Sequence, residues 1–268
     1  MLSRIPVCLK KQGQQDLAGS LGRRRSLEEN DTFVIRGAGR LESSSYKATK
    51  QEKAFRDANE ITNLCEEIGA DIEDVAAGMG YDNRIGNKFL RAGIGYGGSC
   101  FPKDTKALHW LSDYHEQELK TVKAAIEVNN HQKLKLIRKA HKYYEDLEGV
   151  TVAVLGLTFK PGTDDLREAP SLANVPMLLE EGAIVRVYDP VGMERFKELY
   201  PTQVKYCKSA EEALRGAELC LILTDWPKIK EISLKKFAEL MTKPVILDGR
   251  NCHEVDEAMA AEVIYDSM

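Results

Sequence analysis

The chain has 268 residues, enough for two modest domains or one large one. Hydrophobic residues make up 43% of the chain and charged residues 30%, and this balance supports a buried core and excludes disorder by composition. The formal net charge of -4 leaves no excess of cations to neutralise a phosphate backbone, so it argues against nucleic acid as the main partner.

The longest apolar runs, "TVAVLGLTF" and "ELCLILTDW", have the length of strands, so the sequence predicts no membrane span. Six cysteines are scattered along the chain without a C-x-x-C pair or a signal peptide: Cys8, Cys65, Cys100, Cys207, Cys220 and Cys252. This pattern predicts reduced thiols in the cytoplasm, with neither a disulfide framework nor a metal site.

Residues 1–45 have little apolar periodicity, and we expect them to be poorly ordered. Their "RGAG" offers the first two glycines of a dinucleotide-binding loop. The third glycine, the strand–turn–helix context and the acidic residue about 20 positions further on are all missing. The interpretation of "RGAG" is therefore a loop without function.

From Lys47 the pattern becomes helical, with apolar residues at three- and four-residue spacing as far as Cys65. The stretch "GADIEDVAAGMG" predicts a short helix with Asp71 as its N-cap and Gly78 or Gly80 at its end.

Further helical periodicity covers residues 103–112 and 116–144, and Pro102 suits the first turn of the earlier helix. The later helix is long, apolar on one side and charged on the other. We expect it either to cross between domains or to pack against a copy of itself. Residues 46–147 are thus predicted to form a helical domain.

Gly149 marks the change to an α/β pattern. Four β-rich runs, "VTVAVLGLTF", "AIVRVYDP", "LCLILTD" and "PVILDG", alternate with helical stretches. This alternation predicts right-handed βαβ units and a doubly wound parallel sheet over residues 148–268. Ligands of such sheets bind beyond the carboxyl ends of the strands. Polar clusters follow three of these strands, "FKPGTDDLRE", "YDP" and "DGRN", and predict a site there.

The segment "GYGGSCFPKDTKAL" places Cys100 between a glycine-rich loop and a predicted helix start. The positive end of a helix favours a thiolate, and the ammonium group of Lys103 would add to that effect. Asp104, one turn along, is in position to orient a water molecule or accept a proton. The alternative from composition alone is that Cys100 is a small buried hydrophobic residue.

Longer motifs carry a family resemblance. "DNRIGNKFLRAGIGYGGSCFPKDTKAL" (82–108) closely resembles the catalytic segment of the UDP-glucose 6-dehydrogenases, within the UDP-glucose/GDP-mannose dehydrogenase family. "VAVLGLTFKPGTDDLREAPS" (152–171) and "ILDGRN" (246–251) resemble two further signatures of that family. The resemblance runs from about Glu60 to the C-terminus. It implies a helical central dimerisation domain followed by a Rossmann-like UDP-binding domain.

The resemblance also implies a reaction. These enzymes oxidise UDP-glucose to UDP-glucuronate with two NAD⁺, in nucleotide-sugar metabolism and polysaccharide biosynthesis. A cysteine captures the aldehyde as a thiohemiacetal and then carries a thioester, which water hydrolyses. By resemblance Cys100 takes this role and Asp104 assists the water.

Binding residues follow from the same resemblance. Arg84 matches a residue that reaches the substrate site of a neighbouring subunit. Lys103 and Arg167 are expected to bind NAD, and we expect a homodimer formed through the long helix. Phosphate recognition by Lys and Arg at strand ends is sound chemistry. The other expected substrate-binding residues are Phe89, Leu90, Arg91, Gly93, Gly95, Tyr96, Gly97, Phe159, Lys160 and Arg250.

A separate Rossmann domain with GxGxxG begins complete family members, and this sequence contains no such motif, so we expect a partial form. A catalytic lysine and asparagine of the family fall, counted without gaps, at Ser44 and Ala48.

Two other functions stay open from the sequence. One is a non-catalytic module that binds UDP-sugars and dimerises. The other is an unrelated thiol enzyme that pairs Cys100 with His109, His131 or His253 as a base.

Overall fold

The structure, a computed structural model, describes residues 33–35, 39–41, 58–83, 85–86 and 88–268. The chain divides into two compact units, Met1–Tyr46 and Lys47–Met268. In the first unit, β1 (Phe33–Ile35) pairs antiparallel with β2 (Gly39–Leu41), in a stretch for which the sequence predicts no element. The rest of residues 1–45 lies outside the described residues, so its predicted disorder stays a prediction.

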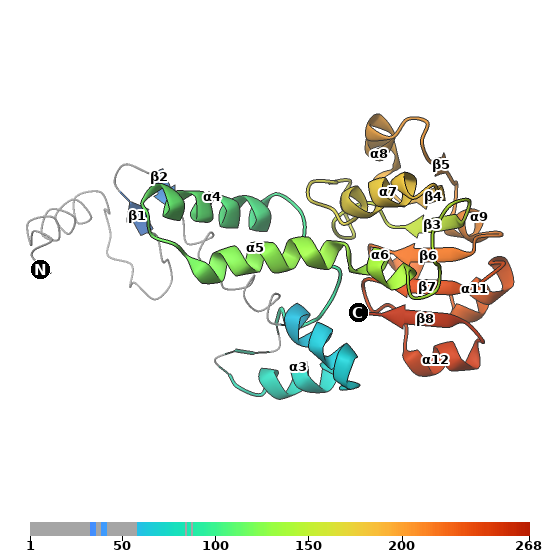
Figure 1. Cartoon of the computed structure of the whole chain (residues 1–268), viewed down its shortest axis with the longest axis horizontal. Helices are drawn as coiled ribbons and strands as arrows, with labels where there is room; N and C mark the ends of the chain where they lie inside the picture. The colour runs from blue at the N-terminus through green and yellow to red at the C-terminus, as the bar shows by residue number, and fades with distance from the viewer. Residues whose placement is uncertain (1–32, 36–38, 42–57, 84, 87) are drawn as a thin grey trace, which may run out of the picture. The chain divides into compact units, whose positions relative to one another are not determined.

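The second unit begins with helices. Residues 58–68 are helical, and α3 (Ile72–Gly80) follows after a short turn. The predicted cap of α3 is confirmed, because the Asp71 side chain accepts a hydrogen bond from the N–H of Glu73 at 2.8 Å. Next, α4 (Cys100–Tyr114) lies beside α5 (Lys120–Lys133) (Figure 1).

The prediction of one helix over 116–144 is wrong. The chain turns after α4, and α5 begins only at Lys120. At Leu134 the backbone leaves helical geometry, with φ -97° and ψ 4°, and the short α6 (Lys135–Ala140) follows. This break lets α6 lie on the sheet, where Leu136 and Ala140 are fully buried.

The rest of the second unit is a six-stranded sheet in the order β5-β4-β3-β6-β7-β8, with every neighbouring pair parallel. The predicted doubly wound α/β fold is confirmed, and so are all four predicted strands. The strands are β3 (Thr151–Leu155), β4 (Ile184–Tyr188), β5 (Lys205–Tyr206), β6 (Leu219–Ile222), β7 (Val245–Asp248) and β8 (Ile264–Ser267). The sequence missed β5 and β8, because β5 has two residues and β8 is a partly exposed edge strand with little alternation.

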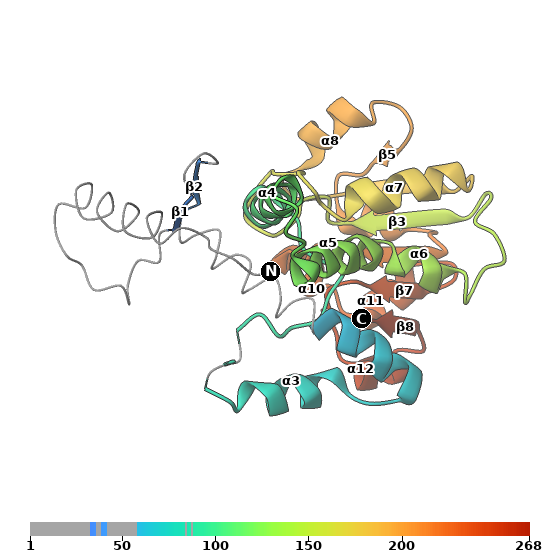
Figure 2. The ribbon, with the colours of Figure 1, turned by 60° about the vertical axis from the view of Figure 1, so that its left-hand side comes forward.

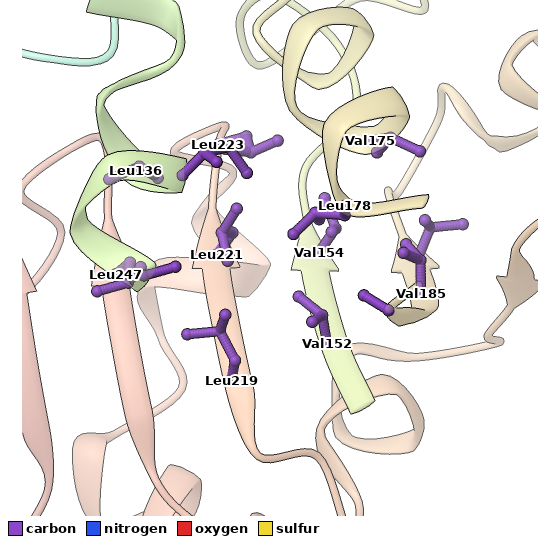
Figure 3. Close-up of a cluster of buried hydrophobic side chains, with 14 of the residues drawn as sticks. Leu136, Val152, Val154, Val175, Leu178, Val185, Leu219, Leu221, Leu223 and Leu247 are labelled. Atoms are coloured by element: carbon purple, nitrogen blue, oxygen red, sulfur yellow. The ribbon is translucent and has the colours of Figure 1, made fainter. Parts of the chain in front are cut away.

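Helices cover both faces of the sheet (Figures 1 and 2). Alternate side chains of β3 point to opposite faces, so Val152 and Val154 join one core while Ala153 and Leu155 join the other. The first core includes residues of α6, α7 and α8 (Figure 3), and the second includes residues of α9, α10, α11 and α12. The bounds are α7 (Ser171–Glu180), α8 (Met193–Leu199), α9 (Ala210–Leu214), α10 (Pro227–Lys230), α11 (Leu234–Leu240) and α12 (Val255–Ala260).

The strand order reverses between β3 and β6, because the chain adds strands first on one side of β3 and then on the other. Open α/β sheets bind their ligands outside the carboxyl ends of the strands at such a point. In the part of the chain that the structure describes, no helix is long and apolar enough to cross a membrane.

Candidate active site

Residues 91–98 form a loop attached to the carboxyl edge of the sheet. The N–H of Ile94 donates to the carbonyl of Gly249, just after β7, at 2.8 Å, and the Ile94 side chain is fully buried in the first core. The Arg91 guanidinium donates to the carbonyl of Asn251 at 3.1 Å. This glycine-rich segment is therefore held as part of the folded unit.

The helices hold the same loop from its other side. Asn59 accepts a hydrogen bond from the N–H of Gly93 at 3.0 Å. Asn129 on α5 makes two bonds to Tyr96, since its Oδ1 accepts from the N–H at 2.8 Å and its Nδ2 donates to the carbonyl at 3.1 Å. Gln132 Nε2 donates to the carbonyl of Gly93 at 3.0 Å. The backbone polar groups of the loop are thus satisfied by amide side chains.

Arg250 connects three segments at this edge. Its guanidinium donates to the carbonyls of Leu223 at 2.8 Å, Phe159 at 3.2 Å and Gly95 at 3.4 Å. Burial lowers the pKa of Arg250, and the nearby Asp225 opposes that shift. The hydrogen-bond acceptors of the guanidinium are carbonyls, so among the described residues no carboxylate is bonded to this cation.

Gly97 and Gly98 bring the loop into contact with the segment after β3. A Cβ on Gly98 would lie 2.8 Å from the ring of Phe159, and a Cβ on Gly97 would lie 2.4 Å from the carbonyl oxygen of Glu168. Gly98 also has φ +85°, and its N–H donates to the carbonyl of Arg167 at 2.7 Å. Only glycine permits this close approach.

Cys100 is the first residue of α4, two positions beyond Gly98, and it is exposed and not in a disulfide. The first-turn N–H groups of this 15-residue helix lie at the same end as Cys100. The rings of Phe89 and Tyr96 both meet Phe101 edge-on, at centroid distances of 6.5 and 6.0 Å. The thiol therefore lies at the edge of an ordered aromatic cluster, which contradicts the alternative of a buried hydrophobic Cys100.

Asp104 lies one turn after Cys100 on the same helix, so the two side chains share a face. Its carboxylate is largely shielded, with 15% of the side chain exposed, and Lys103 Nζ is 3.6 Å from its Oδ1. The Lys103 side chain is 75% exposed. The carboxylate of Asp104 and the thiol of Cys100 therefore lie on the same face of α4.

The turn after β3 brings Arg167 towards the thiol. Asp165 binds the Arg167 guanidinium through Nε and Nη2 at 2.7 to 3.1 Å, which raises the pKa of Arg167 and lowers that of Asp165. Cys100 adds a smaller electrostatic contribution to Arg167. Arg167 and Cys100 are therefore within electrostatic reach of each other.

Glu168 fastens this turn to the helices. Lys106 Nζ on α4 donates to its Oε1 at 2.5 Å, and Lys133 Nζ on α5 donates to its Oε2 at 2.9 Å. Burial acts to raise the pKa of Glu168, but the two lysines outweigh burial and lower it. Glu168 also takes φ +56°, a left-handed conformation that costs energy for a residue with a side chain.

A cavity of about 170 Å³ lies beside Arg250, lined by Asn59, Arg91, Gly93 and Asp225 among others. A second recess, of about 410 Å³, lies beside the α4 N-terminus and is lined by residues that include Lys103 and Arg167. A larger recess of about 600 Å³ beyond β4 contains none of the predicted site residues.

Two family models match the chain. The central domain of the UDP-glucose/GDP-mannose dehydrogenase family matches residues 51–131, and the UDP binding domain of that family matches residues 153–255. Together they cover the Cys100 loop and the sheet with its candidate site. The chain belongs to the UDP-glucose/GDP-mannose dehydrogenase family.

Two curated relatives of the chain are UDP-glucose 6-dehydrogenases. The UDP-glucose 6-dehydrogenase YwqF of Bacillus subtilis is 48% identical over 226 residues, which are 84% of this chain and 50% of the relative. The UDP-glucose 6-dehydrogenase TuaD of the same organism is 45% identical over 78% of this chain and 46% of its own length. The chain thus spans about half the length of the curated relatives it matches.

A solved structure matches in the same way. The UDP-glucose dehydrogenase of Pyrobaculum islandicum superposes with a TM-score of 0.75 and 32% identity, over 84% of this chain and 49% of that one. The fold is therefore that of the sugar-nucleotide dehydrogenases of this family.

Most of the predicted site residues of this family member lie around one edge of the sheet. The loop residues Gly93, Gly95 and Gly97, with Phe159 and Arg250, are joined by direct contacts. Lys160 is exposed, and its Nζ lies 5.3 Å from the centre of the Phe159 ring. Leu90 is buried. Arg84 lies outside the described residues, so its role stays a prediction.

The sequence interpretation missed the amide side chains that hold the loop, Asn59, Asn129 and Gln132. It also missed the carboxylate of Asp225, which follows β6 and lines the cavity beside Arg250. Helical spacing alone marks none of these as functional. The polar residues after β6 were a usable signal, since ligands bind at strand ends. No hydrogen bond within the described residues joins Cys100 to a histidine, and nothing supports the thiol enzyme with a histidine base.

NAD is the cofactor of this family. The recess beside α4 offers Lys103, Lys106 and Arg167 as cations, with the Cys100 helix N-terminus at its edge. Such groups fit the phosphate-bearing part of a dinucleotide. The residues present therefore fit one side of an NAD site.

Proposed function

We propose that this chain supplies the UDP-glucose-binding and cysteine-bearing part of a UDP-glucose 6-dehydrogenase, which oxidises UDP-glucose to UDP-glucuronate. The observation that carries the proposal is the attachment of the Cys100 loop to the sheet edge. Arg250 donates at once to Gly95 in that loop and to Phe159 after β3. The names of the two Bacillus subtilis relatives support the same substrate.

Arg250 and Lys160 would bind the diphosphate. The Arg250 guanidinium is bonded to carbonyls that carry no net charge, so a phosphate would supply the missing anion. Lys160 follows β3 at the same edge of the sheet, is exposed, and is free to move onto a second phosphate oxygen. The sugar would then lie along the loop that contains Phe89, Leu90 and Tyr96, close to Cys100.

Cys100 would act as the nucleophile. Its sulfur adds to the aldehyde carbon and forms a thiohemiacetal, whose oxidation gives a thioester. Asp104 would accept a proton from the water that attacks this thioester, which releases the carboxylate product and restores the thiol. Covalent capture keeps the aldehyde in the site between the two oxidations.

NAD⁺ would accept the electrons of both oxidation steps. Lys103 and Arg167 are the residues of this chain that we expect to bind it, at the recess beside α4. Arg167 is held in a fixed direction by the Asp165 carboxylate, and a guanidinium oriented in advance loses less entropy when it binds phosphate.

A second copy of the chain is a further proposed partner, with the dimer formed through the helical part. Trp110 and Tyr114 on α4 support this proposal. Their rings stack at 5.5 Å between centroids while the residues remain 66% and 71% exposed. Exposed aromatic pairs of this kind are common at protein interfaces.

Calorimetric titration of the full chain with UDP-glucose tests the binding half of the proposal. We expect UDP-glucose and UDP to bind, and GDP-mannose to bind at least tenfold more weakly, because the two Bacillus subtilis relatives are named for UDP-glucose. Absence of heat with a folded sample would contradict the proposal. Binding without NADH formation, when NAD⁺ is added, would instead favour a non-catalytic UDP-sugar-binding module.

Alkylation of Cys100 tests the other half of the proposal, in which this thiol is the nucleophile. Iodoacetamide labelling, followed by mass spectrometry of the peptide, should be faster than for a model thiol and slower when UDP-glucose is present. Cys207 and Cys220 are buried, and burial raises the pKa of both thiols, so they serve as internal controls that label slowly with or without ligand.

A further inference from the structure

Asp189 is a buried carboxylate directly after β4, with 1% of the residue exposed. Its Oδ2 accepts hydrogen bonds from the N–H groups of Leu157 and Thr158, at 2.7 and 3.2 Å. The same oxygen accepts from Trp226 Nε1 at 3.0 Å and from Thr158 Oγ1 at 3.3 Å. One carboxylate oxygen, at the end of β4, therefore accepts from donors that follow two other strands, β3 and β6.

The other oxygen, Oδ1, accepts from the N–H groups of Val191 and Gly192, at 2.9 and 2.7 Å. None of these donors is a lysine or arginine, and no ion pair of Asp189 occurs within the described residues. The negative charge is thus stabilised by neutral N–H and O–H donors, as a bound anion would be.

Asp189 lies at the sheet position where a doubly wound fold usually has an acid that binds the ribose of a ligand. In doubly wound folds, the loop amides after the first strand are the usual site for a ligand phosphate, and the acid after the second strand binds its ribose. Here β3 is the first strand and β4 the second, and the acid bonds to the loop amides itself. The N–H groups of Leu157 and Thr158 both bond to Asp189 and are therefore not available to a ligand phosphate.

The turn that Asp189 holds also carries the candidate site. Thr224 Oγ1 donates to the carbonyl of Thr158. The single proton of the Thr158 hydroxyl is shared between Asp189 Oδ2 and the carbonyl of Lys160, which lies 3.1 Å from Oγ1. Phe159, between them, accepts from Arg250 and contacts Gly98 with its ring. A shift of Thr158 would therefore move Phe159 and Lys160 together.

We propose that the Asp189 carboxylate is a built-in anion. It occupies the N–H groups after β3, so that an external phosphate cannot bind them, and it fixes the Leu157–Lys160 turn. Asp189 is thereby a positioning residue for UDP-sugar binding. The closing of the amides follows from geometry alone. The effect on UDP-sugar binding rests on the proposed function.

The role of Asp189 as a built-in anion can be tested by removing its carboxylate and adding a small soluble carboxylate, formate, in its place. The Asp189→Ala variant leaves a void and several donors without acceptors. We expect amide hydrogen exchange in the peptide that covers Leu157–Lys160 to become about tenfold faster or more. Sodium formate should restore slow exchange and raise the melting temperature of this variant relative to sodium chloride at equal ionic strength.

Val187→Ala is the matched control, because Val187 is a fully buried residue of the same strand that supplies no hydrogen bond to the turn. It should lower the melting temperature without a response to formate and without fast exchange at the turn. An Asp189→Ala variant whose exchange at the turn stays at the wild-type rate, or is not restored by formate, would overturn the built-in anion.

Asp189→Asn keeps the shape and serves if the alanine variant does not fold. Its amide group turns two hydrogens towards donors, so exchange at the turn should again rise, and calorimetric affinity for UDP should fall about tenfold. Trp226→Phe removes one of the four donors to Oδ2 and should produce a smaller change of the same kind.

Wild-type exchange and wild-type UDP affinity in Asp189→Asn would refute the positioning role. A wild-type chain that binds no UDP would refute the proposed function, while the exchange rates would still decide the role of Asp189.

Discussion

Arg250 is the residue on which the candidate site depends most. Its guanidinium donates to carbonyls after β3, after β6 and in the Cys100 loop, so one side chain sets the distance between all three. The planar fork of arginine makes this possible, because its five N–H groups point in fixed directions. Two of those groups are left over for a ligand.

Arg250→Lys should weaken UDP-glucose binding about tenfold or more, measured by calorimetry. Lysine keeps the charge but cannot reach three carbonyls, so the loop loses its attachment as well as its fork of donors. Arg186→Lys is the matched control, since Arg186 on β4 also donates to a carbonyl, that of Arg215 at 2.6 Å. If the Arg250→Lys and Arg186→Lys variants bound UDP-glucose with equal affinity, the positive charge of Arg250 alone would account for its effect on binding.

At the scale of elements, an ion-pair cluster joins the helix that contains residues 58–68 to α6 and β8. Glu66 accepts from Lys135 at 2.6 Å, Lys142 at 2.7 Å and Lys139 at 3.0 Å. Lys139 is 2% exposed and also binds Asp266 of β8. Burial acts to raise the pKa of Glu66, but the three lysines outweigh it and lower the pKa to about 2.

Glu66→Gln should lower the free energy of unfolding by about 1–2 kcal/mol at neutral pH, after allowance for solvent screening of a partly exposed carboxylate. A lowered folded-state pKa stabilises the fold above the ordinary pKa of glutamate, and this stabilisation is lost as pH falls through about 2. Urea unfolding at a series of pH values measures the difference. Glu67→Gln, on the neighbouring exposed residue, should show no such loss. A difference that did not shrink in acid would contradict the ion-pair explanation.

At the scale of the whole molecule, the described parts of the second unit differ in how completely their surfaces are covered. The sheet has helices on both faces and two separate cores. The helical part keeps large side chains in solvent, among them Trp110 and Tyr114 on α4. An exposed pair of aromatic side chains suits a partner of the same kind, since a twofold interface uses one patch twice.

Sedimentation equilibrium of the wild-type chain at micromolar concentration should give twice the mass of one chain. Combined substitution of Trp110 and Tyr114 by alanine should shift the equilibrium towards the monomer. Leu199→Ala, on an exposed residue of α8, is the control and should leave the dimer intact. A wild-type monomer at these concentrations would rule out the proposed dimer.

The sheet and the start of the Cys100 helix could largely be predicted from the sequence. Strand-length apolar runs and the Asp71 cap depend on neighbouring residues, so local pattern is sufficient for them. The break at Leu134 was not accessible in this way. The periodicity continues across it, and the reason for the break is the burial of Leu136 on the sheet, a contact between distant segments.

The candidate site shows the same division. Motif resemblance named Cys100, Lys160 and Arg250 as site residues, and the structure has them at the start of α4, after β3 and after β7, while their roles stay predictions. It did not find Asn129, because this residue acts by bonding to the backbone of a segment more than 30 residues away. The strand-end cluster "YDP" did include Asp189, but the sequence did not show that its carboxylate bonds to the turn after β3.

By itself the sequence determined the order of the elements, the parallel sheet and the presence of a cysteine at a helix start, because all three follow from period, capping and composition along the chain. Tertiary structure alone decided which donors meet which acceptors at the sheet edge. Hydrogen bonds between segments far apart in the chain depend on distances of a few tenths of an ångström, which only the folded backbone fixes.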